Sequence, residues 1–203
     1  MASSQVDVVN NALMRLGDKL ISSMSENNDR ARFMSQIYQG TLDARIRMHN
    51  WNCFTRRAAL SELADSPAFG WDHMFQLPQD PFCLLVLTVN EDGTEQDSFL
   101  KWQVETYATA SATYRVLLTD ETSVNLKYLA RITDVLQWDS LFADAMSADL
   151  AYQACMPLTG SQNLKALLQR EAQEGWRLAK SRDGQEGRPL KKVLSDSLTV
   201  VRL

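Results

Sequence analysis

The stretch His49-Asn50-Trp51-Asn52-Cys53-Phe54-Thr55-Arg56-Arg57-Ala58-Ala59-Leu60 marks the place where the hydrophobic pattern of the chain changes its period. Before it, apolar residues recur every three or four positions, which is typical of a helix with one buried face. After it, prolines at 67, 78 and 81 interrupt any helix, and short runs of apolar residues follow. The stretch therefore separates a helical segment from a β-rich one.

Two helices are predicted before this stretch. An apolar stripe runs from Val6 to Leu20, and Gly17 near its end favours a left-handed cap. Ser23-Met24-Ser25-Glu26 has the form of a capping box, so a second helix should follow it. Its stripe runs from Ala31 to His49, with most of the arginines on other faces.

Two further helices are predicted near the C-terminal end. Helical spacing returns after Asp134 and continues from Trp138 to Cys155, so that the third helix should end at Pro157. Thr159-Gly160-Ser161-Gln162 is a second capping box, and a stripe from Leu164 to Ala179 forms the fourth helix, which should end near Lys180.

Between the two pairs of helices, the pattern predicts strands. Residues 84–89 form a continuous apolar run, and residues 90–93 suit a tight reversal, which favours a hairpin with a following strand over 100–104. Alternation over 114–118 and 126–128 predicts further antiparallel strands with one covered face.

The predicted fold class is α+β: an antiparallel helical bundle of four long helices, an inserted antiparallel β-sheet subdomain and an extended C-terminal tail. Residues 1–50 form the first helical pair, 51–133 the β-rich insertion and 134–180 the second helical pair that completes the bundle. Residues 181–203 form the tail: 181–187 are polar and contain glycine, and 189–203 carry sparse apolar residues among lysines.

Three aromatic residues are predicted to wedge the helices against the strands. Trp51 and Phe54 occur where the helical pattern ends, and Trp71, with Phe75 beside Pro78, follows soon after. Large rings supply much of the packing at such junctions. We expect Trp51, Phe54 and Trp71 to form a structural hinge.

Composition argues against several classes of function. The three cysteines form no C-x-x-C pair, and the chain has only two histidines. The sequence therefore offers almost no ligands for a zinc site and almost no histidine for a nucleophilic triad. No glycine-rich phosphate loop occurs. His49 is interpreted as a satisfied core or interface histidine, with a general base as the alternative. The acidic residues between 91 and 97 are interpreted as a solvated turn rather than a calcium loop.

We therefore predict no enzyme, no catalytic residue, no metal and no cofactor. The chain has no apolar run of the roughly 20 residues that a membrane span needs, and no basic start followed by an apolar stretch. These features favour a soluble protein of a reducing compartment, with no membrane partner.

Charge is distributed unevenly along the chain. Residues 29–57 and 176–203 each carry +4, whereas residues 58–175 carry −11, within a total of −4. Because sequence-independent DNA binding needs a concentrated basic face, this balance does not favour it, and a solvated acidic surface is the ordinary interpretation of the middle segment.

The residues 49–60 quoted above resemble a passage of the head-to-tail adaptor family of tailed bacteriophages, which includes tail tubular protein A. Other passages agree in order and spacing: Ala12-Leu13-Met14-Arg15-Leu16-Gly17 with Ile21 and Ser22; Trp71, Phe75, Leu77-Pro78 and Asp80; Tyr128, Arg131, Asp134, Phe142 and Leu150-Ala151. The resemblance covers about residues 9–170. Thr55 stands where the family often has alanine, and the tail after Lys180 matches no motif of the family.

The resemblance implies a structural virion protein that forms a homo-oligomeric ring, usually dodecameric. Such a ring docks under the portal protein at the neck of the particle, offers a platform to the tail nozzle or another tail protein, and lets double-stranded DNA pass without specific binding. It would be located at the portal vertex of the virion, and in the host cytoplasm during assembly. No active site is implied.

Several finer expectations follow from this resemblance. The tail should bind the portal through its basic and apolar residues, which are Arg188, Lys191, Lys192, Val193, Leu194, Leu198 and Val200. Part of the acidic middle segment should face the lumen and repel passing DNA. The free protein should be monomeric until the portal templates the ring.

Other functions stay open on the sequence. The basic tail could serve a nucleic-acid-binding regulatory protein, for which salt-dependent retention on DNA is the test. A tail-associated hydrolase that uses a pair of carboxylates, and a plain helical interaction module, are further alternatives.

Overall fold

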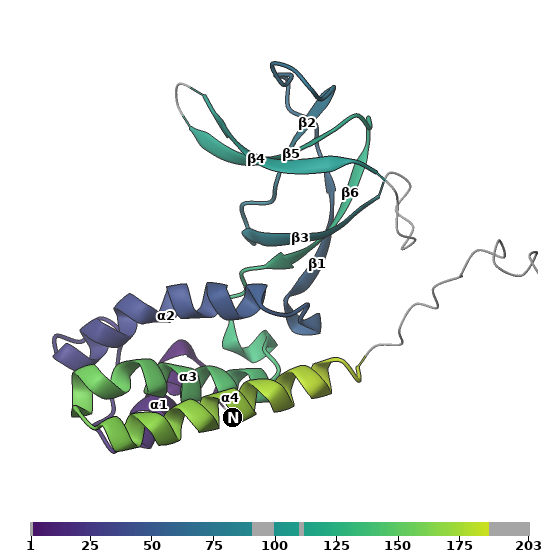
Figure 1. Ribbon diagram of the computed structural model, residues 1–203. Coiled ribbons are helices and arrows are strands. Elements are labelled where there is room, and N and C mark those ends of the chain that lie inside the picture. The colour runs from purple at the N-terminus through teal and green to yellow at the C-terminus, as the bar shows by residue number, and fades with distance from the viewer. Residues whose placement is uncertain (1, 91–99, 110–111, 187–203) are drawn as a thin grey trace, which may run out of the picture.

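The computed structural model describes residues 2–90, 100–109 and 112–186, and these residues form an α+β fold (Figure 1). The predicted fold class is therefore confirmed. Four α-helices lie in one group, and the strands lie beyond the C-terminal end of the second helix (Figure 1). The helices are α1 (Gln5–Leu16), α2 (Asp29–Arg47), α3 (Ser140–Thr159) and α4 (Gln162–Asp183).

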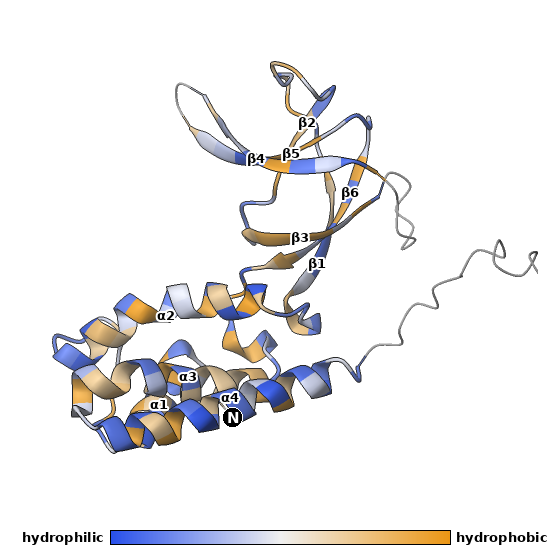
Figure 2. Ribbon diagram, viewed as in Figure 1, coloured by the Kyte–Doolittle hydropathy of each residue, from blue (hydrophilic) through white to orange (hydrophobic). Residues whose placement is uncertain are grey.

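The helix α3 lies at the centre of the bundle, because α1, α2 and α4 all pack against it. Its sequence is apolar on nearly every side, as Figure 2 shows, and such a helix must be covered all round. The two predicted pairs of helices therefore do not pack in the same way. Helices α3 and α4 are joined by a short loop and pack along each other, whereas α1 and α2 each use α3 as their main partner.

Glycine ends α1 earlier than the apolar stripe suggested. Gly17 adopts φ 69°, and backbone amides of Gly17 and Asp18 donate to Met14 and Leu13, as in a Schellman cap. The predicted glycine cap is confirmed. Leu20, which the stripe had included, lies beyond the helix and is exposed.

The start of α2 differs from the prediction. Asn28 caps the helix by accepting from the amide of Ala31 at 2.8 Å. The predicted capping box was wrong, because Glu26 accepts from the amide of Ser22 and so stabilises a loop before the helix. The stripe from Ala31 to Ile46 is buried as expected, but α2 ends at Arg47, so that His49 is not a helical residue.

The junction between α3 and α4 lies slightly later than predicted. Pro157 does not end α3, which continues to Thr159, where Gly160 with φ 65° closes it. Proline is tolerated there because it removes only one backbone hydrogen bond in the last turn. Ser161, rather than Thr159, caps α4 by accepting from the amide of Leu164, and α4 reaches Asp183 rather than Lys180.

The strands form two antiparallel three-stranded sheets. One has the order β1-β6-β3 and the other the order β2-β5-β4. The strands are β1 (Thr55–Leu60), β2 (His73–Gln76), β3 (Cys83–Asn90), β4 (Trp102–Ala108), β5 (Thr113–Thr119) and β6 (Val124–Ala130). The four predicted strands are present, and β1 and β2 are two strands that the sequence pattern did not predict.

The predicted hairpin between 84–89 and 100–104 is wrong for the described residues. Strand β3 pairs with β6, and β4 pairs with β5, so the two segments belong to different sheets. Alternation along a strand fixes which face is buried, but it carries no information about which strand lies alongside. The partner is set by long-range packing.

Alternate residues of β5 serve two different cores. Leu117 joins the main hydrophobic core, whereas Val116 and Leu118 point to the opposite face and pack with Met74 in a smaller cluster. Trp71 packs against this smaller cluster.

Candidate functional site

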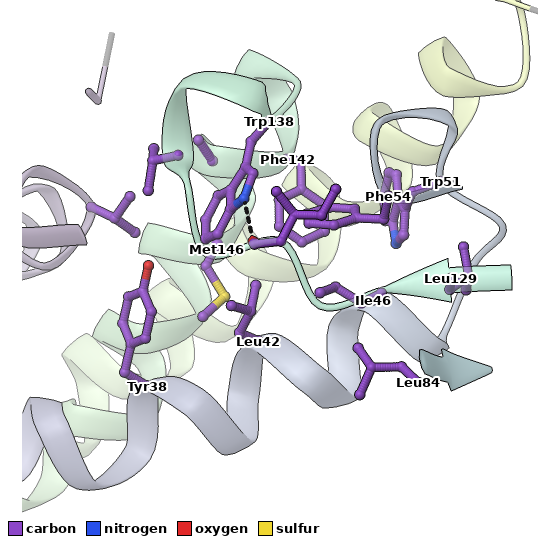
Figure 3. Close-up of a cluster of buried hydrophobic side chains, with 14 of the residues drawn as sticks. Tyr38, Leu42, Ile46, Trp51, Phe54, Leu84, Leu129, Trp138, Phe142 and Met146 are labelled. Carbon is purple, nitrogen blue, oxygen red and sulfur yellow. Dashed lines mark hydrogen bonds between the residues drawn. The ribbon is translucent and has the colours of Figure 1, made fainter. Parts of the chain in front are cut away.

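Five aromatic rings fill the seam between the helical bundle and the first strand. Phe142 of α3 lies at their centre, with its ring centroid 5.0 Å from Trp51 and 4.7 Å from Phe54. Trp138 and Trp176 contact the same ring at 5.3 and 5.2 Å. Most of these pairs meet edge to face, which favours the ring quadrupoles (Figure 3).

The two tryptophans that flank the seam are also held by hydrogen bonds. Trp51 donates from Nε1 to the carbonyl of Arg45 at 3.0 Å. Trp138 donates to the carbonyl of Ile132 at 2.8 Å, as the dashed line in Figure 3 shows. The first carbonyl lies in the last turn of α2, and the second lies in the segment that follows β6. The rings therefore fix the angle at which the chain leaves the bundle.

The three predicted hinge residues occupy two different places. Trp51 and Phe54 are fully buried in the seam, where the sequence analysis had put them. Trp71 is not in the seam, because it covers the smaller cluster on β2 and β5. The proximity of Trp71 to Pro78 in sequence gave no information about which face of the sheet it would cover.

A carboxylate at the end of α4 forms a second link across the seam. Asp183 is almost fully buried and accepts from the amide of Asn52 at 2.9 Å, while His49 Nε2 lies 3.0 Å from its other oxygen. The side-chain amide of Asn52 donates in turn to the carbonyl of Asp183 at 2.8 Å. The end of α4 is thereby fixed to the segment between α2 and β1.

A third link joins the C-terminal part of α2 to the residue that follows β6. Arg131 makes two hydrogen bonds to Asp43, one of them from Nε at 2.9 Å, and its guanidinium stacks over the ring of Phe82 at 4.7 Å. Bidentate pairs of this kind hold both partners in one orientation. The aromatic cluster, Asp183 and Arg131 together leave the first sheet little freedom to rotate against the helices.

A groove of about 790 Å³ opens beside the Asp183 link. Residues from the helical side (His49, Asn52, Asp183 and Gly184) form one wall, and residues of β1, β3 and β6 (Thr55, Arg57, Leu87, Thr88 and Lys127) form the other. The chain leaves the bundle at this point toward the tail. We call this the seam groove.

A second groove of about 460 Å³ lies between α2 and α4, with α3 below it. Its floor holds the bidentate pair of Arg45 and Asp149, with Nε to Oδ2 at 2.6 Å, and the Arg45 guanidinium lies 5.3 Å from the ring of Trp176. Asp149 is almost wholly buried, so removal of Arg45 would leave a buried carboxylate without its partner. We call this the helical groove.

Arg15 links three helices on the other side of α4. It donates from α1 to Glu171 of α4 at 2.7 Å, to Asp144 of α3 at 2.8 Å and to the hydroxyl of Ser147. Partial burial by itself lowers the pKa of the guanidinium, but the hydrogen bonds to Glu171 and Asp144 more than compensate, and the net shift is upward.

Several of these residues carried a signal that the sequence analysis missed. Asp183 lies in the last turn of a helix, where the macrodipole disfavours an acid, so a partner from elsewhere should have been expected. Asp149 interrupts an almost wholly apolar helix and so required a cation nearby. Nothing in the sequence indicated that Arg45 would be that cation.

His49 is a satisfied interface histidine, as predicted, although it reaches Asp183 from a loop. The other histidine, His73, bonds Glu62 at 2.6 Å, and this hydrogen bond raises the pKa of His73. Burial raises the pKa of the Cys53 and Cys83 thiols to about 11.

Other predicted sites lie outside the described residues. These are the acidic residues of 91–97 and the proposed portal-binding set Arg188, Lys191, Lys192, Val193, Leu194, Leu198 and Val200. Across residues 2–90, 100–109 and 112–186, no group of three or more His, Cys, Asp or Glu side chains is arranged to hold a metal ion. None of the helices in that part of the chain combines the length and the hydropathy needed to span a bilayer.

Comparison with known proteins gives no assignment: no protein-family model matches the chain, and no curated protein sequence matches it.

Proposed function

We propose that this protein is a structural head-to-tail adaptor of a tailed bacteriophage. Copies of the chain form a ring under the portal protein, line part of the DNA channel and present a platform for the tail. The order and spacing of the motifs quoted above suggest this role. The chain acts as a building block and carries out no chemistry of its own.

The observation that best supports the proposal is the set of three connections across the seam. The aromatic cluster around Phe142, the bonds of Asp183 to Asn52 and His49, and the pair of Arg131 with Asp43 join the bundle to the first sheet. A subunit that bears load between a capsid and a tail needs such a fixed relation between its parts. The grooves described above are surfaces for protein contacts.

The tail is the proposed portal clamp. It begins just after Asp183, whose buried carboxylate fixes the base of the tail to the rest of the subunit. Force on a portal-bound tail would therefore act on the seam. Part of the acidic segment 58–175, which has a net charge of −11, supplies the proposed lumen wall.

The test mixes the protein with purified portal particles and counts occupied particles by electron microscopy. The full chain should form rings on the portal. A chain that ends at Glu186 retains all of α4 and the Asp183 link, and should lose attachment while its circular dichroism spectrum and melting temperature stay unchanged. A chain that ends at Lys180 would be a poor test, because it also removes Asp183.

Charge reversal gives a variant with no loss of chain. Lys191→Glu combined with Lys192→Glu should weaken attachment. The matched double change Lys19→Glu with Arg32→Glu should not, because these two exposed residues belong to the loop after α1 and to the first turn of α2, outside the tail. Unchanged attachment of the shortened chain would overturn the portal clamp. Absence of rings on the portal with every variant, the full chain included, would overturn the adaptor. Salt-dependent retention on DNA that needs the tail would favour the nucleic-acid-binding regulator instead.

A further inference from the structure

The loop between β1 and β2, residues 61–72, carries the most exposed large apolar side chain in the described part of the chain. Phe69 is 88% exposed. Pro67 precedes it, and Gly70 follows it with φ 87°, a conformation that glycine adopts at low cost. We call this segment the Phe69 loop. Aromatic side chains are enriched where proteins contact one another, so the loop offers an anchor for such a contact.

The Phe69 loop is tied to the second sheet on both sides of Phe69. The amide of Leu63 donates to the carbonyl of Met74 at 2.8 Å, and the hydroxyl of Tyr107 donates to Asp65 at 2.8 Å. On the other side, Trp71 packs against the smaller hydrophobic cluster. A side chain on a loop that is already ordered loses less conformational entropy when it binds. Phe69 is therefore presented in a form suited to docking.

The loop and the helical groove lie at opposite ends of the molecule. Figure 1 shows residues 61–72 at the end of the strand region farthest from the helices, whereas the helical groove lies between α2 and α4. Because the loop is tied to the second sheet, it does not reach the groove of its own copy. A contact between the two surfaces therefore joins two copies of the chain.

The helical groove has the lining and the size for an aromatic ring. Trp176, Ala172 and Tyr152 form an apolar floor, and Met48, which is 55% exposed, stands at the rim. The groove has a volume of about 460 Å³, and a cavity of about 150 Å³ is enough to hold a benzene molecule. The ring of Phe69 would therefore fit on this floor.

The groove keeps a positive charge after its internal ion pairs are counted. Its two arginines are each bound by a carboxylate of the same chain, so neither adds a net charge. Lys180 also lines the groove, and the Nζ of Lys165 lies 5.4 Å from the ring centroid of Tyr152. Neither lysine forms an ion pair with a residue that the structure describes. Two positive charges therefore stand without a carboxylate partner beside the apolar floor.

The Phe69 loop keeps a negative charge by the same count. Residues 61–72 contain three carboxylates and no lysine or arginine. Glu62 is bound to His73, but Asp65 accepts from an uncharged hydroxyl, which leaves its charge in place. Asp65 and Asp72 form no ion pair within the described ranges. The carboxylates near Phe69 and the lysines of the groove are therefore complementary.

We propose that the Phe69 loop of one copy docks in the helical groove of the next copy, with Phe69 on the apolar floor and Asp65 and Asp72 toward Lys165 and Lys180. Because the two surfaces differ, the contact is heterologous and repeats from copy to copy, which closes a ring when the rotation per subunit allows it. This inference rests on the proposed function and deepens it, since it names the residues through which subunits of the ring meet.

Cross-linking between two single-cysteine variants tests this pairing. Ala68→Cys lies in the loop and Gln173→Cys at the groove, both at exposed positions, and each variant carries a different tag. The samples are rings formed on portal particles, and the free protein at high concentration. They are treated at pH 7 with a short bismaleimide. The natural thiols should react little, because burial raises the pKa of Cys53 and Cys83 to about 11 and Cys155 is buried.

The proposal predicts a cross-linked pair that contains both tags in the mixture, and no product when either variant is treated alone. A dimer of Ala68→Cys alone would show a two-fold contact between loops and would overturn the proposal. Rings on the portal without any mixed product would overturn it too, while leaving the adaptor function intact. A mixed product from free protein that never attaches to the portal would support the contact and count against the adaptor, and the absence of both would refute both.

A substitution gives an independent measurement. Phe69→Ala should raise the protein concentration needed for half-maximal ring formation on the portal by about tenfold or more, because an interface depends mainly on a few anchor residues. Its melting temperature should stay unchanged, since Phe69 is exposed in the single chain. Leu136→Ala is the matched control, because Leu136 is 74% exposed and belongs to neither surface. Equal effects of the two changes, or no effect of Phe69→Ala, would contradict the assignment of the loop.

Discussion

Replacement of Trp51 by alanine should be among the most damaging single changes in the seam. Trp51 has no exposed surface, its ring lies 5.0 Å from Phe142 and 5.9 Å from Trp176, and its Nε1 donates to the carbonyl of Arg45. Truncation of a buried tryptophan to alanine costs about 3–5 kcal/mol, because it removes transfer free energy and leaves a cavity. Domains are stable by about 5–15 kcal/mol, so the loss is a large part of the total.

Urea denaturation followed by circular dichroism measures this loss. With a slope of about 2–3 kcal/mol per molar urea, the midpoint should fall by more than about 1 M. Trp71→Ala is the matched control, since Trp71 is only partly buried and covers the smaller cluster. We expect about 1 kcal/mol for that change, near the average for point substitutions.

The comparison between the two tryptophans can refute the reasoning. If Trp51→Ala costs no more than Trp71→Ala, or less than about 1 kcal/mol, then the seam does not behave as a well-packed core and the large-to-small rule does not apply there. A double change of Trp51 and Phe142 to alanine should cost less than the sum of the single changes, because the two rings contact each other.

Three further predictions concern polar groups. Arg45→Met should destabilise by about 3–5 kcal/mol because it strands the buried carboxylate of Asp149, and Arg45→Met combined with Asp149→Leu should recover most of that loss in the same urea assay. Asp183→Asn should cost about 1–3 kcal/mol, through the weakened bond to the Asn52 amide, and should increase the rate at which trypsin cleaves the chain near residue 180. The pKa of His73, measured by NMR titration, should lie above the ordinary histidine value and should fall in Glu62→Gln. Because the pair with Glu62 raises the folded-state pKa of His73, it stabilises the fold fully below about pH 6. That stabilisation is lost as the pH rises through the folded-state pKa.

Local features of the fold followed directly from the sequence where a single element decides them. Gly17 ends α1 as predicted, since only glycine adopts a positive φ at low cost. The stripe of α2 from Ala31 to Ile46 is buried, because a helical period fixes its apolar face, and the strand around 84–89 is present, because a short apolar run followed by turn residues favours a buried strand. The capping positions were wrong by a few residues, because Ser23 and Thr159 had neighbours, Asn28 and Ser161, that could cap equally well.

Choices between partners did not follow from the sequence. The pairing of β3 with β6, the position of Trp71 on the far face of the second sheet and the bond of Asp183 to Asn52 all join residues that are distant along the chain. Periodicity describes which face of an element is apolar, and the free energy of joining two such faces depends on how the whole chain packs.

The sequence by itself determined that helices enclose a β-rich insertion, that Trp51 and Phe54 lie at the change between them, and that charge is concentrated in the middle and at the end of the chain. The tertiary structure alone decided that α3 is the shared core of the bundle, that the strands divide into two sheets, and that the end of α4 is bound through Asp183 to the segment between α2 and β1. The physical reason is that each of these features joins residues distant along the chain, and the apolar faces of separate elements acquire their partners only when the whole chain packs.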